Sequence, residues 1–524
     1  MFGLTLSLQK AALPLALFCV LYAVKRLVEF RQAVRLTGNW PGFRTLFNDR
    51  FLFFPFRARG ISPGPQWMFY TKHADFEKAG WDVLTAVNAF PSPGISYYIA
   101  DAAIIKEILG ARARFPKPPE IYEPLTAFGS NILVTEGEVW KRQRKIAAPA
   151  FSERNNRLVW DETIRILEDL FHNVWEDKDV VEVDHVLDIT VGITLLVIGV
   201  AGFGRRISWI DDGIAPPGHS VTFKDALYKV SHDLFLKIIF PPWLLRIGTP
   251  RMRKYIQAHT ELDAYLKEMV QNRRSAEVKE ERHDLFTSLL DANEDETDHE
   301  AKLTDSELFG NIFIFLVAGY ETTAHTLAYA LIFLALYPEE QEKFYQNINS
   351  ILPSDRAPTY DEFGSLSYAM AVFHETLRHF APVTTIPKQS AEDTAFNLTN
   401  AAGEKATIAV PRGSFLALCT HSLHHNPRYW DDPGAFKPER FLGNYPRDAF
   451  IPFSGGPRGC IGRGFAETEA VAVLSMIVSR YTIGVREEPQ FAGETFEQRK
   501  ARLLDTDNTL TIYPKRAPLV FKRR

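Results

Sequence analysis

The feature that most constrains the fold is a long apolar segment in the second half of the chain, from Thr304 to Leu336. It begins with the sequence Thr304-Asp-Ser-Glu307, a capping box in which the two end residues can satisfy each other's backbone N–H groups. Pro338 follows the segment, and proline cannot continue a helix because it lacks the N–H donor. Thirty-odd helical residues measure roughly 45–50 Å, so this predicted helix can cross a whole domain.

The remaining patterns predict a mainly α-helical protein with small β-sheets. Helical patterns dominate from about residue 137 to 380, and strand-like pieces appear late, at 406–410 and 510–513. The chain has 524 residues, 46% of them hydrophobic, which is enough for one large domain. We expect residues 61–524 to form this domain and residues 1–60 to precede it as a separate segment.

The N-terminal segment is expected to anchor the chain in a membrane. Residues 1–24 are mostly apolar, and about 20 apolar residues span a bilayer. Lys25 and Arg26 follow, which predicts a single-pass anchor with the body in the cytosol. A cleaved signal peptide is the alternative, although no small-residue cleavage site stands out. The aromatic stretch Phe51–Phe56 is either part of the core or a second segment at the membrane interface.

Charge and cysteine content exclude two classes of protein. The formal net charge is −4 and the pI is about 6.4, so no basic footprint for nucleic acid is present. The only cysteines are Cys19, Cys419 and Cys460. So few unclustered cysteines in a long chain do not form a disulfide framework, and they favour a reducing compartment.

A glycine-rich loop surrounds the last of these cysteines. The sequence Phe-Ser-Gly-Gly-Pro-Arg-Gly-Cys-Ile-Gly-Arg-Gly-Phe-Ala covers residues 453–466, and a helical pattern follows it. Glycines let backbone amides come close, and amides together with a helix N-terminus stabilise a thiolate. A thiolate is the haem ligand that favours O–O cleavage. A phosphate-binding loop or a structural turn are the alternatives, but the Gly-x4-Gly-Lys pattern of a phosphate loop is absent.

The loop resembles the haem-binding signature of the cytochrome P-450 superfamily, Phe-x-x-Gly-x-Arg-x-Cys-x-Gly. Every fixed position is matched, by Phe453, Gly456, Arg458, Cys460 and Gly462. The resemblance covers roughly residues 61–524 and implies the helical cytochrome P-450 fold with small β-sheets. It further implies haem b as the cofactor, with Cys460 as the ligand of its iron.

A second motif lies inside the long helix. The sequence Ala318-Gly319-Tyr-Glu321-Thr322 resembles the oxygen-binding motif of the same family. Gly319 has no side chain, so a ligand can lie against the helix there. Glu321 and Thr322 form an acid–alcohol pair that can relay protons to the reacting oxygen. Taken alone, the same residues would fit a polar patch that faces another helix.

A third motif is expected to be structural. Glu375 and Arg378, in the sequence Glu375-Thr-Leu-Arg378, share one face of a helix. A surface ion pair is the simple interpretation and contributes under about 1 kcal/mol. The family resemblance implies instead a buried network that Arg440 completes.

The resemblance also implies a set of donors for the haem propionates. Trp140 and Arg144 match the Trp-x-x-x-Arg element of an early helix, and Arg458 of the cysteine loop would join them because Arg suits planar carboxylates. Gln143 stands where many relatives have His, which puts a third donor in doubt. Lys388 stands where relatives often have Arg, so we expect a weaker contact.

The function implied is that of a monooxygenase. One oxygen atom from O2 would enter a lipophilic small molecule held above the haem. We expect four segments to line the substrate pocket, namely Ile121–Ile132, Phe315–Thr322, Val383–Ile386 and Leu504–Leu510. The sequence as a whole resembles fungal members of the superfamily, many of which oxidise terpenoids or other secondary metabolites. That analogy specifies no molecule.

Electrons must come from another protein. No glycine-rich dinucleotide fingerprint is apparent and no length remains for a flavin domain, so a separate NADPH-dependent cytochrome reductase is the expected partner. Together with the predicted anchor, this suggests the endoplasmic reticulum membrane, with the catalytic domain in the cytosol.

Two other functions are compatible with parts of the sequence. An enzyme of the same fold can rearrange an already oxidised substrate without a reductase, but retention of Glu321 and Thr322 argues against it. A non-enzymatic haem protein is the other possibility. A c-type electron carrier would show Cys-x-x-Cys-His, which is missing, and a gas sensor would be expected to carry an output domain, which is not visible.

Overall fold

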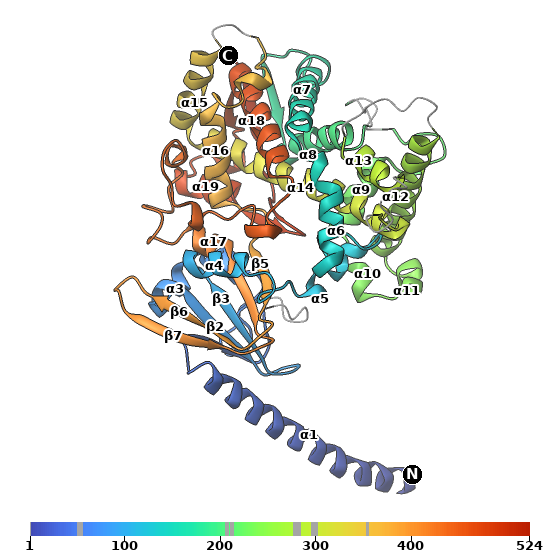
Figure 1. Cartoon of the computed structure of the whole chain (residues 1–524), viewed down its shortest axis with the longest axis vertical. Helices are drawn as coiled ribbons and strands as arrows, with labels where there is room; N and C mark the ends of the chain where they lie inside the picture. The colour runs from blue at the N-terminus through green and yellow to red at the C-terminus, as the bar shows by residue number, and fades with distance from the viewer. Residues whose placement is uncertain are drawn as a thin grey trace. The chain divides into compact units, whose positions relative to one another are not determined.

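The computed structural model describes residues 2–49, 56–204, 209, 214–275, 284–294, 302–352 and 356–524 (Figure 1). Contacts divide the chain into two units, and each contains pieces that lie far apart in the sequence. Unit 1 comprises Met1–Pro118, Thr384–Gly434 and Pro446–Gly459. Unit 2 comprises Pro119–Val383, Ala435–Tyr445 and Cys460–Arg524.

Unit 1 is built on a mixed five-stranded sheet. Its strand order is β1 (Gly42–Thr45), β2 (Val83–Asn88), β3 (Gly94–Ile99), β8 (Phe415–Cys419) and β5 (Thr385–Gln389). A separate hairpin, orange in Figure 1, pairs β6 (Thr394–Thr399) with β7 (Lys405–Val410). The helices of this unit are α1 (Phe2–Leu36), α2 (Trp67–Thr71), α3 (Ala74–Ala79), α4 (Ala102–Gly110) and α17 (Thr420–His424).

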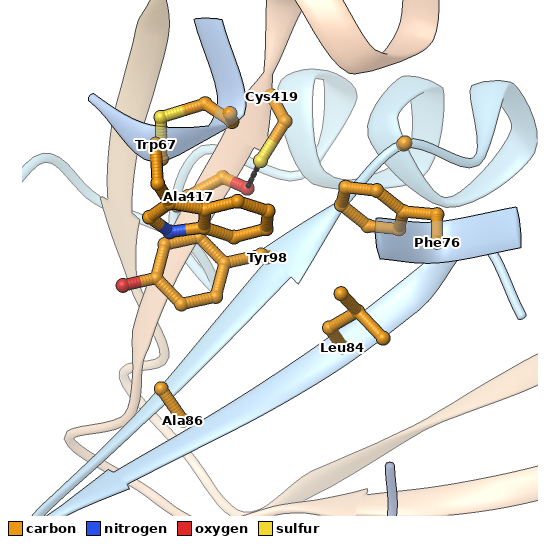
Figure 2. Packing of buried hydrophobic residues seen from close by; sticks show 9 residues of the cluster. Trp67, Phe76, Leu84, Ala86, Tyr98, Ala417 and Cys419 are labelled. Atoms are coloured by element: carbon orange, nitrogen blue, oxygen red, sulfur yellow. Dashed lines mark hydrogen bonds between the residues drawn. The ribbon is translucent and has the colours of Figure 1, made fainter. Parts of the chain in front are cut away.

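An aromatic cluster packs against one part of this sheet (Figure 2). The rings of Trp67 and Tyr98 meet edge to face with centroids 5.1 Å apart, and Trp67 stacks on Phe76 at 6.0 Å. The thiol of Cys419 donates to the carbonyl oxygen of Ala417 at 3.4 Å. Burial raises the pKa of the Cys419 thiol far above its ordinary range. Cys419 is therefore a neutral core residue and cannot supply a thiolate.

Unit 2 is mostly helical and carries two small sheets. One sheet has the order β4 (Val180–Val183), β12 (Leu519–Arg523), β9 (Tyr481–Val485), and the other pairs β10 (Thr506–Asn508) with β11 (Ile512–Pro514). The helices are α5 (Pro119–Tyr122), α6 (Gly137–Ala147), α7 (Glu153–Asp169), α8 (Val186–Val197), α9 (Phe223–His232), α10 (Leu236–Ile239), α11 (Pro242–Ile247), α12 (Pro250–Arg274), α13 (Leu285–Glu294), α14 (Asp305–Leu336), α15 (Pro338–Ile351), α16 (Ser367–His379), α18 (Arg463–Arg480) and α19 (Phe496–Leu503).

The predicted long helix is confirmed as α14, and it is buried along almost its whole length. Both halves of the capping box form: Thr304 Oγ1 accepts from the N–H of Glu307 at 3.2 Å, and the Glu307 carboxylate accepts from the N–H of Thr304 at 2.9 Å. Gly310 lets a neighbouring chain segment come close, because a Cβ there would lie 2.3 Å from the carbonyl oxygen of Ser130. The helix packs against α8, α16, β9 and β11.

The buried ion-pair network predicted from Glu375-Thr-Leu-Arg378 is also confirmed. Arg378 donates to both carboxylate oxygens of Glu375, from Nε at 2.7 Å and from Nη2 at 2.8 Å. Arg440 adds an ion pair at 3.5 Å, and the N–H of Lys437 donates to Glu375 at 2.9 Å. Burial alone would raise the pKa of Glu375, but Arg378 and His379 outweigh burial and lower it to about 2. Removing one partner of such a pair typically costs about 3–5 kcal/mol, so the network is structural.

The strand predictions hold with one adjustment. The strand expected at 406–410 is β7, Lys405–Val410. The strand expected at 510–513 is β11, which begins later and includes Pro514, opposite Thr506. Proline is tolerated there because the sheet has two strands and the missing N–H can face outward. Thr511 consequently belongs to the turn between β10 and β11.

The next feature is the N-terminal segment, for which the sequence predicts a membrane anchor. Residues 2–36 form helix α1, but none of the helices in the described part of the chain combines the length and apolar character needed to cross a bilayer. The single-pass anchor is therefore not confirmed. Residues 51–55 of the aromatic stretch lie outside the described residues. The division at residue 60 stays a prediction, and β1, which precedes it, pairs with β2 of the sheet.

Candidate functional site

Cys460 lies just before helix α18, whose N-cap residue is Gly462. Its side chain is exposed, in contrast to the buried Cys419. The dense protein surroundings raise the pKa of the Cys460 thiol, while the backbone N–H of Gly462 and the charges of Arg144 and Arg463 act in the opposite direction. A sulfur that is accessible, accepts a hydrogen bond from a backbone N–H and lies near two guanidinium groups is suited to bind a metal as a thiolate.

The conformation of the cysteine loop depends on one glycine. Gly456 has a φ of +61°, and a Cβ there would lie 2.3 Å from the carbonyl oxygen of Leu109 in α4. Of the five glycines in the loop, Gly456 alone has a positive φ, so the other four contribute by their small size. Phe453 and Arg458 flank this turn in unit 1, and their contacts with a haem stay predictions.

One face of α14 is open where the second motif lies. Ala318 is exposed, and Gly319 and Thr322 are half-buried, whereas the residues around them in the helix are buried. Thr322 follows Ala318 by four residues and Gly319 by three, and both spacings bring residues side by side on a helix, so the three form a single accessible patch. Gly319 also has a packing role, because a Cβ there would lie 2.9 Å from the side chain of Ile198.

Glu321 and Thr322 point in different directions. The hydroxyl of Thr322 donates to the carbonyl oxygen of Ala318 at 2.9 Å. The carboxyl of Glu321 is buried and accepts from the hydroxyls of Thr511 at 2.9 Å and Thr509 at 3.2 Å. Burial raises the pKa of Glu321 to about 7, although these hydroxyls and the backbone N–H of Thr511 lower it. Near neutral pH this acid can therefore hold or release a proton.

Thr509 and Thr511 were missed in the sequence analysis. They belong to the short connection between β10 and β11 and reach Glu321 across more than 180 positions of sequence. The alternation Thr-Leu-Thr beside a strand was the available signal, but nothing in the sequence says which helix such a turn meets.

The predicted propionate donors of helix α6 lie together in unit 2. Trp140 is buried, and the guanidinium of Arg144 lies 5.9 Å from the centre of its ring, as expected for an i, i+4 pair. Gln143 is buried and donates its amide to Glu307 at 3.0 Å, which ties α6 to the start of α14. Lys388 is buried in β5 of unit 1, and its expected weak contact stays a prediction.

We predict that Gly456→Ala weakens the cysteine loop. The left-handed conformation is unfavourable for alanine, and its Cβ meets backbone, so unit 1 should lose about 1–3 kcal/mol of unfolding free energy. Gly455→Ala is the matched control: its φ is −167° and the new Cβ meets only the flexible side chain of Leu109, at 3.2 Å. Chemical denaturation of the two variants measures the difference, and equal stabilities would contradict the account.

Comparison with known proteins gives the family of the chain. The family model described as "Cytochrome P450" matches residues 88–501. "Cytochrome P450 monooxygenase 124" of Postia placenta is 58% identical over 96% of this chain and 97% of its own length. "Phomenoic acid biosynthesis cluster cytochrome P450 monooxygenase" of Leptosphaeria maculans is 26% identical, over 78% of this chain and 76% of its own length.

The fold agrees as well. The crystal structure of the cytochrome "P450DA heme domain" superposes with a TM-score of 0.71 at 23% identity, covering 88% of this chain and 93% of that one. The predicted fold class is thereby confirmed for the globular part. Family model, relatives and fold agree with the cysteine loop, and the chain belongs to the cytochrome P-450 family of monooxygenases.

Proposed function

We propose that this monooxygenase binds haem b through Cys460 and inserts one atom of O2 into a lipophilic small molecule. The observation that carries the proposal is that unit 2 contains both an exposed cysteine and an accessible patch on a largely buried helix. A haem needs a ligand for its iron and a helix surface without bulky side chains, and Cys460 and the patch of Ala318, Gly319 and Thr322 meet both needs.

The residues present fit such a group. Cys460 would hold the iron, with the N–H of Gly462 stabilising its thiolate. Trp140 and Arg144 of unit 2 would donate to the propionates. Gly456 would keep the loop in shape, and the contact expected for Arg458 stays a prediction. Thiolate-ligated haem, when bound, supplies the redox chemistry that splits O2 after two electrons arrive.

The protein's own contribution to that chemistry is proton control. Thr322 presents its hydroxyl on the accessible patch and has its hydrogen directed to the Ala318 carbonyl, so its oxygen is free to accept another hydrogen bond. Glu321 holds a proton near neutral pH because burial raises its pKa to about 7. Thr322 can therefore orient a donor at the accessible patch, while Glu321 can hold or release a proton from its buried position.

The substrate class follows from the relatives and from the lining that the sequence predicts. A relative carries the name of a phomenoic acid biosynthesis cluster enzyme, and we propose by analogy that this chain oxidises a terpenoid or other secondary metabolite. Phe315, in a predicted lining segment, is buried and lies beside Phe151 with ring centroids 5.7 Å apart. Aromatic and aliphatic lining favours a lipophilic molecule.

Membrane attachment belongs to this proposal. In α1 the side chains of Leu17, Phe18 and Leu21 are about 60% exposed, which is unusual for large apolar groups. We propose that α1 inserts into the endoplasmic reticulum membrane as a single-pass anchor, with the catalytic part in the cytosol. A separate NADPH-dependent cytochrome reductase in the same membrane would then supply electrons.

The Thr322 hydroxyl gives the first test. We predict that Thr322→Ala keeps haem but converts most reducing power to peroxide, with product per NADPH falling about tenfold or more. The measurement compares the oxygen and NADPH consumed with the peroxide and product formed. The assay contains a reductase and, as the substrate, a compound that perturbs the haem spectrum on binding. Thr323→Ala is the matched control, because Thr323 is the next residue of α14 and is buried. Unchanged coupling in Thr322→Ala would count against the proposed role.

Removal of α1 tests the attachment. We predict that deletion of residues 1–36 moves the protein at least partly from the membrane pellet to the supernatant, because the exposed apolar side chains of α1 are lost. Fractionation of cells that express the full and the shortened chain measures the change. A shortened chain that stays wholly in the pellet after a high-salt wash would show that another segment is the main anchor.

A further inference from the structure

The carboxyl of Glu321 is not held by the helix that carries it. Its hydrogen-bond donors come from the connection between β10 and β11: the hydroxyls of Thr509 and Thr511 and the N–H of Thr511. That connection is itself fixed, since the N–H of Thr509 donates to the carbonyl oxygen of Thr511 at 3.0 Å. A turn far away in sequence thus determines where this acid points.

Thr511 also contacts a second titratable side chain of α14. The distance from its Oγ1 to Nδ1 of His325 is 2.7 Å, and all three side chains are buried. His325 follows Glu321 by four residues, so both lie on the same face of the helix. Burial lowers the pKa of His325 to about 3, so the imidazole is neutral at working pH. The Thr511 hydroxyl therefore bridges a carboxyl and a neutral imidazole.

A hydroxyl has one hydrogen, so Thr511 can donate to only one of these two neighbours at a time. When Glu321 is ionised, the hydrogen of Thr511 points to the carboxylate and Nδ1–H of His325 donates to Thr511. When Glu321 is protonated and the single proton of His325 sits on Nε2, the O–H of Glu321 can donate to Thr511, whose hydrogen then turns to the unprotonated Nδ1. The chain of bonds on the ionised acid is charge-assisted and is therefore the stronger one.

Few other groups around this unit titrate near neutral pH. Burial raises the pKa of Tyr228, Tyr320 and Tyr513, which face Glu321 from α9, α14 and β11, so all three stay neutral. Burial lowers the pKa of His185 and His232, whose charges would otherwise act on His325. Asp188 in α8 lies near Tyr228. Glu321 is the group of this cluster whose pKa is raised to about 7.

We propose that Thr511 and His325 are positioning residues for Glu321, and that the three side chains form one unit in which ionisation of the acid and direction of the Thr511 hydroxyl change together. Among the residues that the structure describes, the hydrogen bonds of Thr511 and His325 lead to Glu321 and none of them reaches the accessible patch of α14, so both act through Glu321. The role assigned to the acid rests on the proposed function, whereas the coupling itself is a property of the folded chain.

The experiment is an infrared pH titration of the haem-loaded full chain, without substrate or reductase. The carbonyl band of protonated Glu321 is identified as the band that Glu321→Gln removes. Thr511→Val keeps the shape of the side chain but removes the hydroxyl that stabilises the Glu321 carboxylate. The midpoint of the Glu321 titration should therefore rise by about one pH unit. Thr511→Ser should restore the wild-type midpoint. An unchanged midpoint in Thr511→Val overturns the proposal.

His325 is tested by a double-mutant cycle. His325→Leu should raise the midpoint of the Glu321 titration, because Thr511 then loses the Nδ1–H donor that supports its bond to the ionised acid. This rise should vanish in the Thr511→Val background. Thr509→Val is the matched control: Thr509 also donates to Glu321, so the effect of His325→Leu should persist in that background. Equal effects of His325→Leu in all backgrounds would show that His325 acts independently and would overturn the coupling.

These results are independent of the proposed function. Failure of thiolate ligation would show in the spectrum of the carbon-monoxide complex of every variant, wild type included. Failure of the coupling would show only in the carboxyl titration, while that spectrum stays normal.

Discussion

The burial of α14 on all sides is the constraint on which the arrangement of unit 2 depends. A helix of 32 residues that is apolar around its circumference has to be covered by other elements, and α8, α16, β9 and β11 cover it. At Gly310 neighbouring backbone atoms come too close for any side chain, whereas at Gly319 the close neighbour is the side chain of Ile198. In the middle of the helix the patch of Ala318, Gly319 and Thr322 remains accessible, so packing determines where a cofactor could meet this part of it.

Two buried glutamates of unit 2 show how partners determine the charge of an acid. Glu375 is fully buried, yet its pKa is lowered to about 2 because Arg378 and His379 compensate for burial. Glu321 is almost as buried, but only neutral hydroxyls and an amide contact it, so its pKa is raised to about 7. The first acid is permanently charged and serves the fold. The second can exchange a proton, which is the property that a proton-delivering group needs.

Local patterns allowed much of this to be predicted. The capping box correctly predicted the residue at which α14 begins. The three-residue spacing of Glu375 and Arg378 correctly predicted that the two side chains share one face of a helix. The specific spacing of the cysteine loop indicated the family. These features depend on neighbours in sequence, and a single sequence displays such neighbours directly.

The contacts of Glu321 could not be predicted in the same way. Adjacent positions in a helix point about 100° apart, so the pairing of Glu321 with Thr322 in sequence does not make them partners in space. The actual partner, Thr511, lies 190 residues away, and only the packing of β11 on α14 brings it there. Likewise, nothing local indicated that Gln143 is engaged by Glu307, which follows from the approach of α6 to the start of α14.

The central claim is that Cys460 binds haem iron as a thiolate, and the absorption spectrum of the reduced carbon-monoxide complex tests it most directly. The account predicts a strongly red-shifted Soret band in the folded wild-type chain and its loss in Cys460→Ala, since Cys419 is buried and neutral. A band typical of histidine-ligated haem in the wild-type protein, or a red-shifted band that persists in Cys460→Ala, would contradict the assignment.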